Sequence, residues 1–393
     1  MAASKPLSIR ALNRATLARQ GLLEPFSTAP VDAVRRVGSL QAQHPEWPPV
    51  ALAARSADAR TADLAGALDQ RTVVRSSLMR ITIHVVAADD LWPMFTVMKP
   101  MRLDQWRLLL KHDPVDSPLG RRMTAAHQVA IEALRERPRS SLELDRLMAA
   151  EIGVEATSVS RPAWRRPESQ LVVRAAWRHF AAFVPLVHVP HEGEGYGRSR
   201  YALATDWLAV EPPEIDPAEA RVHLARRYLA AFGPATVQDL AAYVGRGKGG
   251  IGVWKEAVAA LGDEVTELRD QDGRALFDLI DAPRPDEAVP VPARLLARWD
   301  SLLLSHASAA RGRVIATHHR PRVYSRNADV LPTFLIDGLV AGTWEVVRSD
   351  GAAAITLRPF AKLASADAEA LEAEAHRVLA LMGESQRSVR FAR

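Results

Sequence analysis

One order of elements recurs three times along the chain and constrains the fold most: a helix, a short capped helix, a third helix and a β-hairpin. The pattern is clearest between residues 216 and 282. Pro217 suits the first turn of a helix, and Thr236 with Asp239 forms a capping box at the start of a second helix. A third helix follows, and the dipeptide at 272–273, Asp-Gly, closes an alternating hairpin. This order is typical of a winged-helix unit.

The same order occurs twice upstream, over residues 123–203 and, less regularly, over residues 12–86. In the middle copy the hairpin loop, residues 191–197, is long and rich in glycine. The copies lie roughly 90 residues apart, which suits a small module better than a turn of a solenoid. We therefore predict an α+β fold with three tandem winged-helix units.

After Pro283 the segments become short, β-rich and separated by Gly, Asp or Asn turns, which predicts a small, partly closed domain resembling a β-barrel. One amphipathic helix and a last strand should follow it. The predicted domains are winged helix 1 with the catalytic motif (1–115), winged helix 2 (116–212), winged helix 3 (213–285) and the C-terminal β-domain (286–393).

Composition limits the chemistry. The chain has 393 residues, enough for several packed units, and no cysteine, so disulfides, thiolate nucleophiles, iron–sulfur clusters and cysteine-based zinc sites are excluded. No apolar run approaches the roughly 20 residues that span a bilayer, so we expect a cytoplasmic protein associated with the nucleoid and not with membranes. Nearly all the positive charge is Arg, which forks onto phosphates and base edges, although a GC-rich genome explains an Arg excess equally well.

The hairpin of the first unit offers one set of DNA contacts. Strand alternation places Arg80, Thr82 and His84 on one face, opposite Met79 and Ile81. We expect the polar face to meet the phosphate backbone. The alternative is a solvated strand face with His84 covered by the core.

A glutamine pair ends the second predicted helix of the first unit. Pro45 disfavours helical geometry at His44, and in an extended exit the side chains of Gln41 and Gln43 can face one cleft. On composition alone, such a pair is explained as two ordinary solvent-exposed polar residues without a catalytic role.

A resemblance raises the importance of this pair. The strings SLQAQ, RSSLMRITIH, YLAAFGPATVQDLAAYVG, RWDSLLLSH and ADVLPTFLIDGLVAGTW together resemble the AlkZ-like winged-helix DNA glycosylases over essentially the whole chain. Members of that family use a Gln-x-Gln or Gln-x-Asp motif in catalysis, and some unhook interstrand crosslinks or remove bulky adducts. The resemblance implies that Gln41 and Gln43 are the catalytic residues of the Gln-x-Gln branch, that three winged helices are scaffolded by a C-terminal β-domain, and that double-stranded DNA with alkylated purines is the partner.

The implied chemistry is consistent with these residues. An N7- or N3-alkylated purine is already a cationic leaving group, so a Gln amide that positions water suffices without a general acid, a metal or a cofactor. Lyase activity would need an amine, and no Lys lies near the pair in sequence, although Lys99 could approach through the fold. We expect a monofunctional glycosylase that accepts bulky adducts, and by extension interstrand crosslinks, without flipping the base.

A basic segment of the C-terminal region is a second candidate for DNA contacts. Its charged residues crowd one predicted hairpin, which could lie along or inside a groove; a solvated basic loop is the alternative. They are Arg311, Arg313, His318, His319, Arg320 and Arg322. The two adjacent histidines do not suffice for a metal site, since neighbours on a strand point apart.

Three other functions stay open on sequence alone: a transcriptional regulator, a drug-sequestering resistance protein and a structural nucleoid protein. A regulator usually dimerises on a palindromic operator, whereas three unlike units in one chain suit a monomer on an asymmetric lesion.

Overall fold

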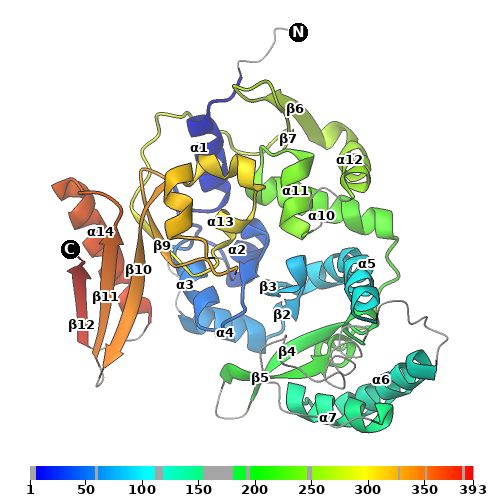
Figure 1. Ribbon diagram of the computed structural model, residues 1–393. Helices are drawn as coiled ribbons and strands as arrows, with labels where there is room; N and C mark the ends of the chain where they lie inside the picture. The colour runs from blue at the N-terminus through cyan, green and yellow to red at the C-terminus, as the bar shows by residue number, and fades with distance from the viewer. Residues whose placement is uncertain are drawn as a thin grey trace.

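The computed structural model describes residues 6–57, 61–110, 118–153, 180–191, 195–245, 250–325, 328–349, 352–382 and 386–392. The first unit packs small helices around a three-stranded sheet of order β1-β3-β2 (Figure 1). Its elements are α1 (Ile9–Arg19), α2 (Pro30–Val37), β1 (Leu40–Gln41), α3 (Trp47–Ala53), α4 (Thr61–Asp69), β2 (Val73–Ser77), η1 (Met79–Ile81), β3 (Ile83–Ala87), η2 (Ala88–Asp90) and α5 (Leu91–Leu110).

Two local predictions for this unit were wrong. The stretch over 78–86, expected as one strand, contains the 3₁₀ turn η1 and the strand β3, which form a hairpin with the preceding strand β2. The glutamine pair does not end a helix: α2 stops at Gly38, whose φ of +80° turns the chain into the short strand β1. A helix that the sequence pattern does not indicate, α3, begins at Trp47 with prolines in its first turn, where their missing N–H costs nothing.

The second unit contains a helix pair and a two-stranded sheet, seen at the lower right of Figure 1. A capping box between Ser140 and Glu143 begins its second helix, as the sequence pattern suggests. The third predicted helix, over 168–183, lies largely outside the described residues. The described elements are α6 (Pro118–Glu136), α7 (Ser141–Ile152), β4 (Leu186–His191), β5 (Gly195–Leu203) and α9 (Ala204–Leu208).

The third unit follows the predicted order of elements. Asp216 caps the first helix, the capping box of Thr236 and Asp239 starts the second, and Gly245, at φ +109°, ends it. The elements are α10 (Pro217–Phe232), α11 (Val237–Val244), α12 (Ile251–Ala259), η4 (Gly262–Glu264), β6 (Val265–Arg269) and β7 (Ala275–Leu279).

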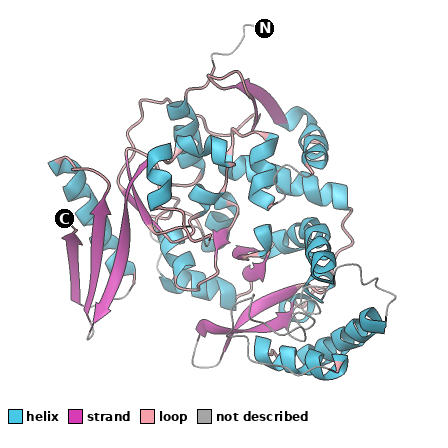
Figure 2. Cartoon of the chain, viewed as in Figure 1, coloured by secondary structure: helices cyan, strands magenta, loops and turns pink. Residues whose placement is uncertain are grey.

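The C-terminal region is an open sheet, so the prediction of a β-barrel-like domain was wrong. Five strands in the order β12-β11-β10-β9-β8 leave β12 and β8 as free edges, and α14 packs on the sheet (Figures 1 and 2). The elements are β8 (Arg294–Leu296), α13 (Ser301–Leu304), η5 (Ser308–Arg313), η6 (Thr317–Arg322), β9 (Thr333–Ile336), β10 (Leu339–Ser349), β11 (Ala352–Pro359), α14 (Ser365–Leu381) and β12 (Gln386–Phe391). The basic segment is therefore two 3₁₀ turns and not a hairpin.

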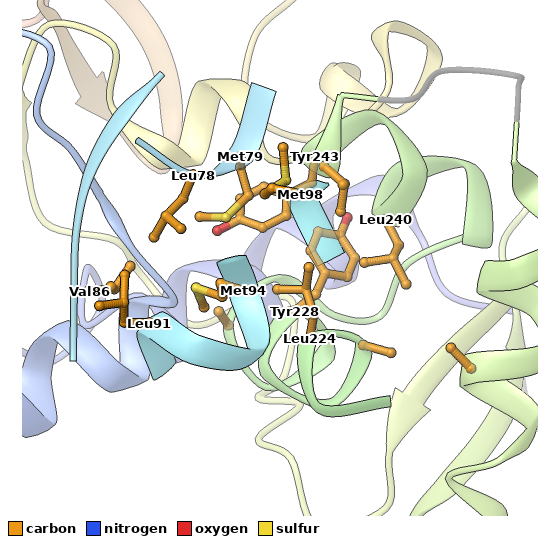
Figure 3. Close-up of a cluster of buried hydrophobic side chains, with 14 of the residues drawn as sticks. Leu78, Met79, Val86, Leu91, Met94, Met98, Leu224, Tyr228, Leu240 and Tyr243 are labelled. Carbon is orange, nitrogen blue, oxygen red and sulfur yellow. The ribbon is translucent and has the colours of Figure 1, made fainter. Parts of the chain in front are cut away.

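One apolar cluster joins the three units. It combines side chains of the first hairpin and α5 with β4, β5 and the helices of the third unit. In Figure 3, Leu78 and Met79 of the η1 turn share this cluster with Tyr228 of α10 and Tyr243 of α11. The packing fixes the η1 turn against α11, which brings together residues more than 160 positions apart.

Candidate active site

Gln41 and Gln43 are placed by strand pairing. Gln41 lies opposite His84 in the β1–β3 ladder, and the backbone N–H of Ala42 donates to the carbonyl of Ile83 over 2.8 Å. The side chain of Gln41 is nearly buried, at 8% exposure, whereas Gln43 is exposed. The pair therefore sits at the edge of the protein surface, with one amide inside and one in solvent.

The turn between β2 and β3 supplies the neighbours of these amides. Nη2 of Arg80 and Oγ1 of Thr82 each lie 3.4 Å from Oε1 of Gln41. The backbone N–H of Ile83 lies 3.4 Å from Oε1 of Gln43. The structure thus brings the predicted catalytic pair together with two of the three residues that the sequence assigned to DNA contacts in the first hairpin.

Arg80 is held on several sides. Its Nη1 donates to the carbonyl of Tyr243 over 2.6 Å, its guanidinium carbon lies 5.5 Å from the centre of the Tyr243 ring, and its Nη2 lies 3.3 Å from Nε2 of His84. Burial lowers the pKa of Arg80, and the nearby Arg311 lowers it further, but an Arg stays protonated at neutral pH. A cation is therefore fixed beside the carbonyl of Gln41.

His84 is an acceptor in this arrangement. The carbonyl of Thr82 lies 2.9 Å from Nδ1, which must carry the proton, so Nε2 accepts from Arg80. Burial first, and then the charge of Arg80, lower the pKa of His84 to about 3. A buried neutral imidazole makes no phosphate contact, so we remove His84 from the proposed DNA face.

The basic segment of the C-terminal region divides into an inner and an outer part. Arg313 is buried at 3% exposure, and its Nη1 donates to the carbonyl of Pro234 over 2.9 Å. Arg311 is half-buried over the ring of Tyr324 and donates to the carbonyl of His306. Arg313 is therefore unavailable to DNA, because its guanidinium is enclosed by protein.

The outer part presents the remaining predicted contacts. Arg322 is exposed and stacks on Phe360 at 4.1 Å, while Arg320 donates to the carbonyl of Ser308. The rings of His318 and His319 lie 4.0 Å apart, contrary to the expectation of divergent strand neighbours, because the segment is a 3₁₀ turn. Nevertheless, no group of three metal-ligating side chains occurs among the described residues.

Sequence patterns gave no sign that Tyr243, Ser39 and Gly245 are parts of the site. The hydroxyls of Tyr243 and Ser39 lie 2.9 Å apart, which ties the end of α11 to the entry of β1. Gly245 ends α11 directly against the backbone of Arg80. The helix-ending glycine was visible in the sequence, but no local pattern indicates that it lies against a residue 165 positions earlier.

A second aromatic contact lies beside the pair. The ring of His44 lies 5.1 Å from that of Trp299, whose backbone has the unusual φ of +53°. Trp47, by contrast, packs on Trp344 in the sheet region and faces away from solvent for much of its surface. Trp47 therefore belongs to the core that supports α3.

Comparison with known proteins identifies the family. The family model described as "DNA glycosylase AlkZ-like" matches residues 34–381. The interstrand DNA cross-link repair glycosylase of Streptomyces sahachiroi is 28% identical over 221 residues, 55% of this chain and 55% of that protein, so the chain spans about half the length of this curated relative in the alignment.

The fold is similar to a solved structure. Streptomyces sahachiroi DNA glycosylase AlkZ matches with a TM-score of 0.77 and 21% identity, covering 99% of this chain and 100% of that one. In the part of the chain that is described, no helix is both long and apolar enough to cross a bilayer. Because the family model covers most of its length, the chain belongs to the AlkZ-like DNA glycosylase family.

Proposed function

We propose that this protein is a monofunctional DNA glycosylase that hydrolyses the N-glycosidic bond of N7- and N3-alkylated purines, including bulky adducts and interstrand crosslinks. The observation that supports this most is the placement of Gln41 and Gln43, where the family motif falls: one exposed amide and one nearly buried amide side by side at the edge of the protein surface, the buried one contacted by the half-buried guanidinium of Arg80. The crosslink substrate is suggested by the name of the Streptomyces sahachiroi relative.

The chemistry needs little from the protein. The alkylated base already carries a positive charge, so the enzyme must position water near the anomeric carbon and tolerate an oxocarbenium-like transition state. Gln43 is exposed and its carbonyl accepts one long backbone hydrogen bond, which leaves a lone pair for that water. Neutral, undamaged purines should be poor substrates because no general acid assists their departure.

The proposed mechanism is hydrolysis without a lyase step, and Lys99 has a contact of its own. Its ammonium group lies 4.9 Å from the centre of the Phe183 ring, whereas the side chains of Gln41 and Gln43 hydrogen-bond to Arg80, Thr82 and Ile83. Lyase activity would require an amine at the anomeric carbon.

Access without base flipping is consistent with the position of one large cavity. This cavity, about 780 Å³, lies between α1, α11, α12, the β6–β7 hairpin and η5, and its lining includes neither Gln41 nor Gln43. A flipping enzyme would enclose the target base in a pocket with its catalytic residues. An amide pair at the edge of the protein surface can instead meet a large lesion in the duplex.

We further propose that the three units are winged helices, with the boundaries predicted from sequence, and that a single copy binds one lesion. Thr82, Arg311, His318, His319, Arg320 and Arg322 remain the proposed contacts to the duplex.

The test is base release from a duplex with a single 7-methylguanine or a bulky N7 adduct. Gln41→Ala and Gln43→Ala should each slow excision about 100-fold or more, with DNA affinity retained. Wild-type rates in both variants would refute the assignment. DNA binding without any base release by the wild-type protein would favour the regulator instead.

A further inference from the structure

We propose that Arg80 is a positioning residue: it fixes the orientation of the Gln41 amide, so that Gln41 acts on DNA as a hydrogen-bond donor. The proposal rests on the proposed glycosylase function and assigns separate roles to the two glutamines. It also replaces the sequence-based interpretation of Arg80 as a phosphate contact.

The orientation follows from what each group can do. A guanidinium only donates hydrogen bonds, so the Gln41 atom that faces Nη2 of Arg80 must be the carbonyl oxygen. The hydroxyl of Thr82 lies at the same distance from this oxygen, and it has a second acceptor in the carbonyl of Met79 at 3.0 Å. The Gln41 carbonyl is therefore engaged inside the protein, and its NH₂ group is the part left for a ligand.

Both terminal nitrogens of Arg80 have further partners in the protein. Nη1 is bound to the last turn of α11 through the carbonyl of Tyr243, and Nη2 also reaches the acceptor nitrogen of His84. Helix C-termini attract cations, which adds to the hold on Arg80. Because both terminal nitrogens are engaged by the protein, the guanidinium is poorly placed to form a forked contact with a phosphate.

The backbone around Arg80 is strained in a way that supports a functional role. Arg80 and Ile81 have φ of +56° and +55°, the left-handed region that costs a non-glycine residue about 1–2 kcal/mol. Such strain persists only where the surroundings over-determine it, and it is concentrated at functional sites. Here Met79 is anchored in the core on one side, and Gly245 leaves just enough room for the Arg80 backbone on the other.

The two amides then divide the work. The NH₂ of Gln41, polarised by the cation on its carbonyl, donates to a phosphate or deoxyribose oxygen of the damaged nucleotide. The exposed carbonyl of Gln43 accepts from the attacking water. Both roles are compatible with a cationic leaving group that needs no acid.

Gln41→Glu tests the donor role directly. Glutamate keeps the size of the side chain and pairs with Arg80, but it loses both amide hydrogens. If Gln41 works as a donor, single-turnover excision of 7-methylguanine at saturating enzyme should fall as far as in Gln41→Ala, about 100-fold. If Gln41 instead aligns water through its carbonyl, the carboxylate is the stronger acceptor and excision should be retained, which would overturn the proposal.

Arg80 variants separate positioning from phosphate binding. Arg80→Ala should slow single-turnover excision about 10- to 100-fold while DNA affinity and its salt dependence stay unchanged; Arg80→Lys, which keeps the charge but not the fork, should restore the rate only in part. The double variant with Gln41→Ala should be no slower than Gln41→Ala alone. A smaller salt slope with a normal rate, or full rescue by Lys, would contradict the role.

A spectroscopic readout tests the positioning without reference to activity. The side-chain amide signal of Gln41, assigned by its loss in Gln41→Ala, should shift or broaden in Arg80→Ala. It should stay in place in the control Arg226→Ala, which removes an exposed arginine of α10 that pairs with Glu264. An unchanged Gln41 signal in Arg80→Ala would refute the positioning role, whereas absence of excision by the wild-type enzyme would refute the proposed function.

Discussion

The first and third units each contain a hairpin, and the two turns are built in opposite ways. The β6–β7 turn is exposed and formed mainly by its own residues: Asp270 accepts from the backbone of Asp272 and Arg274, and Gly273 supplies the positive φ, while the backbone of Leu7 pairs with its edge. The β2–β3 turn puts positive φ on Arg80 and Ile81, and packs against α11.

The difference shows which kind of turn needs support from the rest of the fold. A turn with a glycine and its own hydrogen bonds is cheap, and it can form from local sequence alone. A turn that places two non-glycine residues in the left-handed region needs tertiary support. That support is also what places Arg80 beside Gln41, so the more costly turn is the one at the candidate site.

Acid should affect the region of the first hairpin most. Burial lowers the pKa of three histidines to about 3: His84 in β3, His188 in the adjacent β4, and His306 near α10. Their unfolded value is near 6.5, so full stability holds above pH 6.5 and is lost as pH falls toward the folded value. From pH 7 to pH 5 each should cost about 2 kcal/mol, roughly 6 kcal/mol together.

Urea unfolding at pH 7, 6 and 5 measures this loss. The β6–β7 hairpin contains no histidine, so hydrogen exchange at pH 5 should show the amides of β3 and β4 opening before those of β7. Equal stability at pH 7 and pH 5 would show that these imidazoles are not buried in neutral form.

The third hairpin should instead depend on an ion pair in its strand. Asp278 of β7 is fully buried and receives two hydrogen bonds from the guanidinium of Arg19, at 2.6 and 2.9 Å. Asp278→Ala leaves a buried cation without its partner and should cost about 3–5 kcal/mol. Glu267→Ala on the same hairpin removes an exposed pair with Arg269 and should cost less than about 1 kcal/mol. Equal losses by urea unfolding would contradict this difference.

The sequence predicts the locally formed hairpin of the third unit better than the hairpin of the first unit, which depends on tertiary contacts. The third unit was predicted element by element, because its helix starts, capping box and Asp-Gly turn are all local signals. The strand expected through Arg80 was wrong, since alternation over 78–86 cannot reveal a turn that α11 imposes. Arg80 is turned toward Gln41 and Tyr243, a placement that no local pattern indicates, whereas Thr82 stays a proposed contact to the duplex.

The C-terminal region shows the other limit. Its strands and final helix follow from turn residues and periodicity, whereas the closure of a sheet depends on contacts that no local pattern contains. The 3₁₀ turns of the basic segment were missed because alternating charges look like a strand. Burial of Arg313, against Pro234 of another unit, is likewise a tertiary fact.

Ala substitutions at two glycines, one beside each turn, test this difference. Gly245 and Gly273 both have positive φ, so Ala at either position should cost about 1–2 kcal/mol. A Cβ on Gly245 would lie 3.0 Å from Cα of Arg80, whereas one on Gly273 meets open space. Gly245→Ala should therefore also slow excision, by about tenfold, and Gly273→Ala should leave it unchanged. Equal excision rates in the two variants would show that the C-terminal end of α11 does not support the candidate active site.

The smallest expected effect concerns arginines that face outward. Arg320 and Arg322 lie on the outer 3₁₀ turn, and removing one phosphate-binding side chain should reduce the slope of log affinity against log salt by about 0.9. Arg320→Ala and Arg322→Ala should weaken binding to damaged and undamaged duplex equally, with single-turnover excision at saturation unchanged, because phosphate contacts position a protein without reading bases. Arg80→Ala should do the reverse. DNA-binding titrations at several salt concentrations distinguish the outer arginines from Arg80. If Arg320→Ala and Arg322→Ala leave the salt slope unaltered, the DNA-binding face does not include η6. If Arg80→Ala reduces the salt slope, the guanidinium of Arg80 reaches the DNA backbone despite its partners Tyr243 and His84.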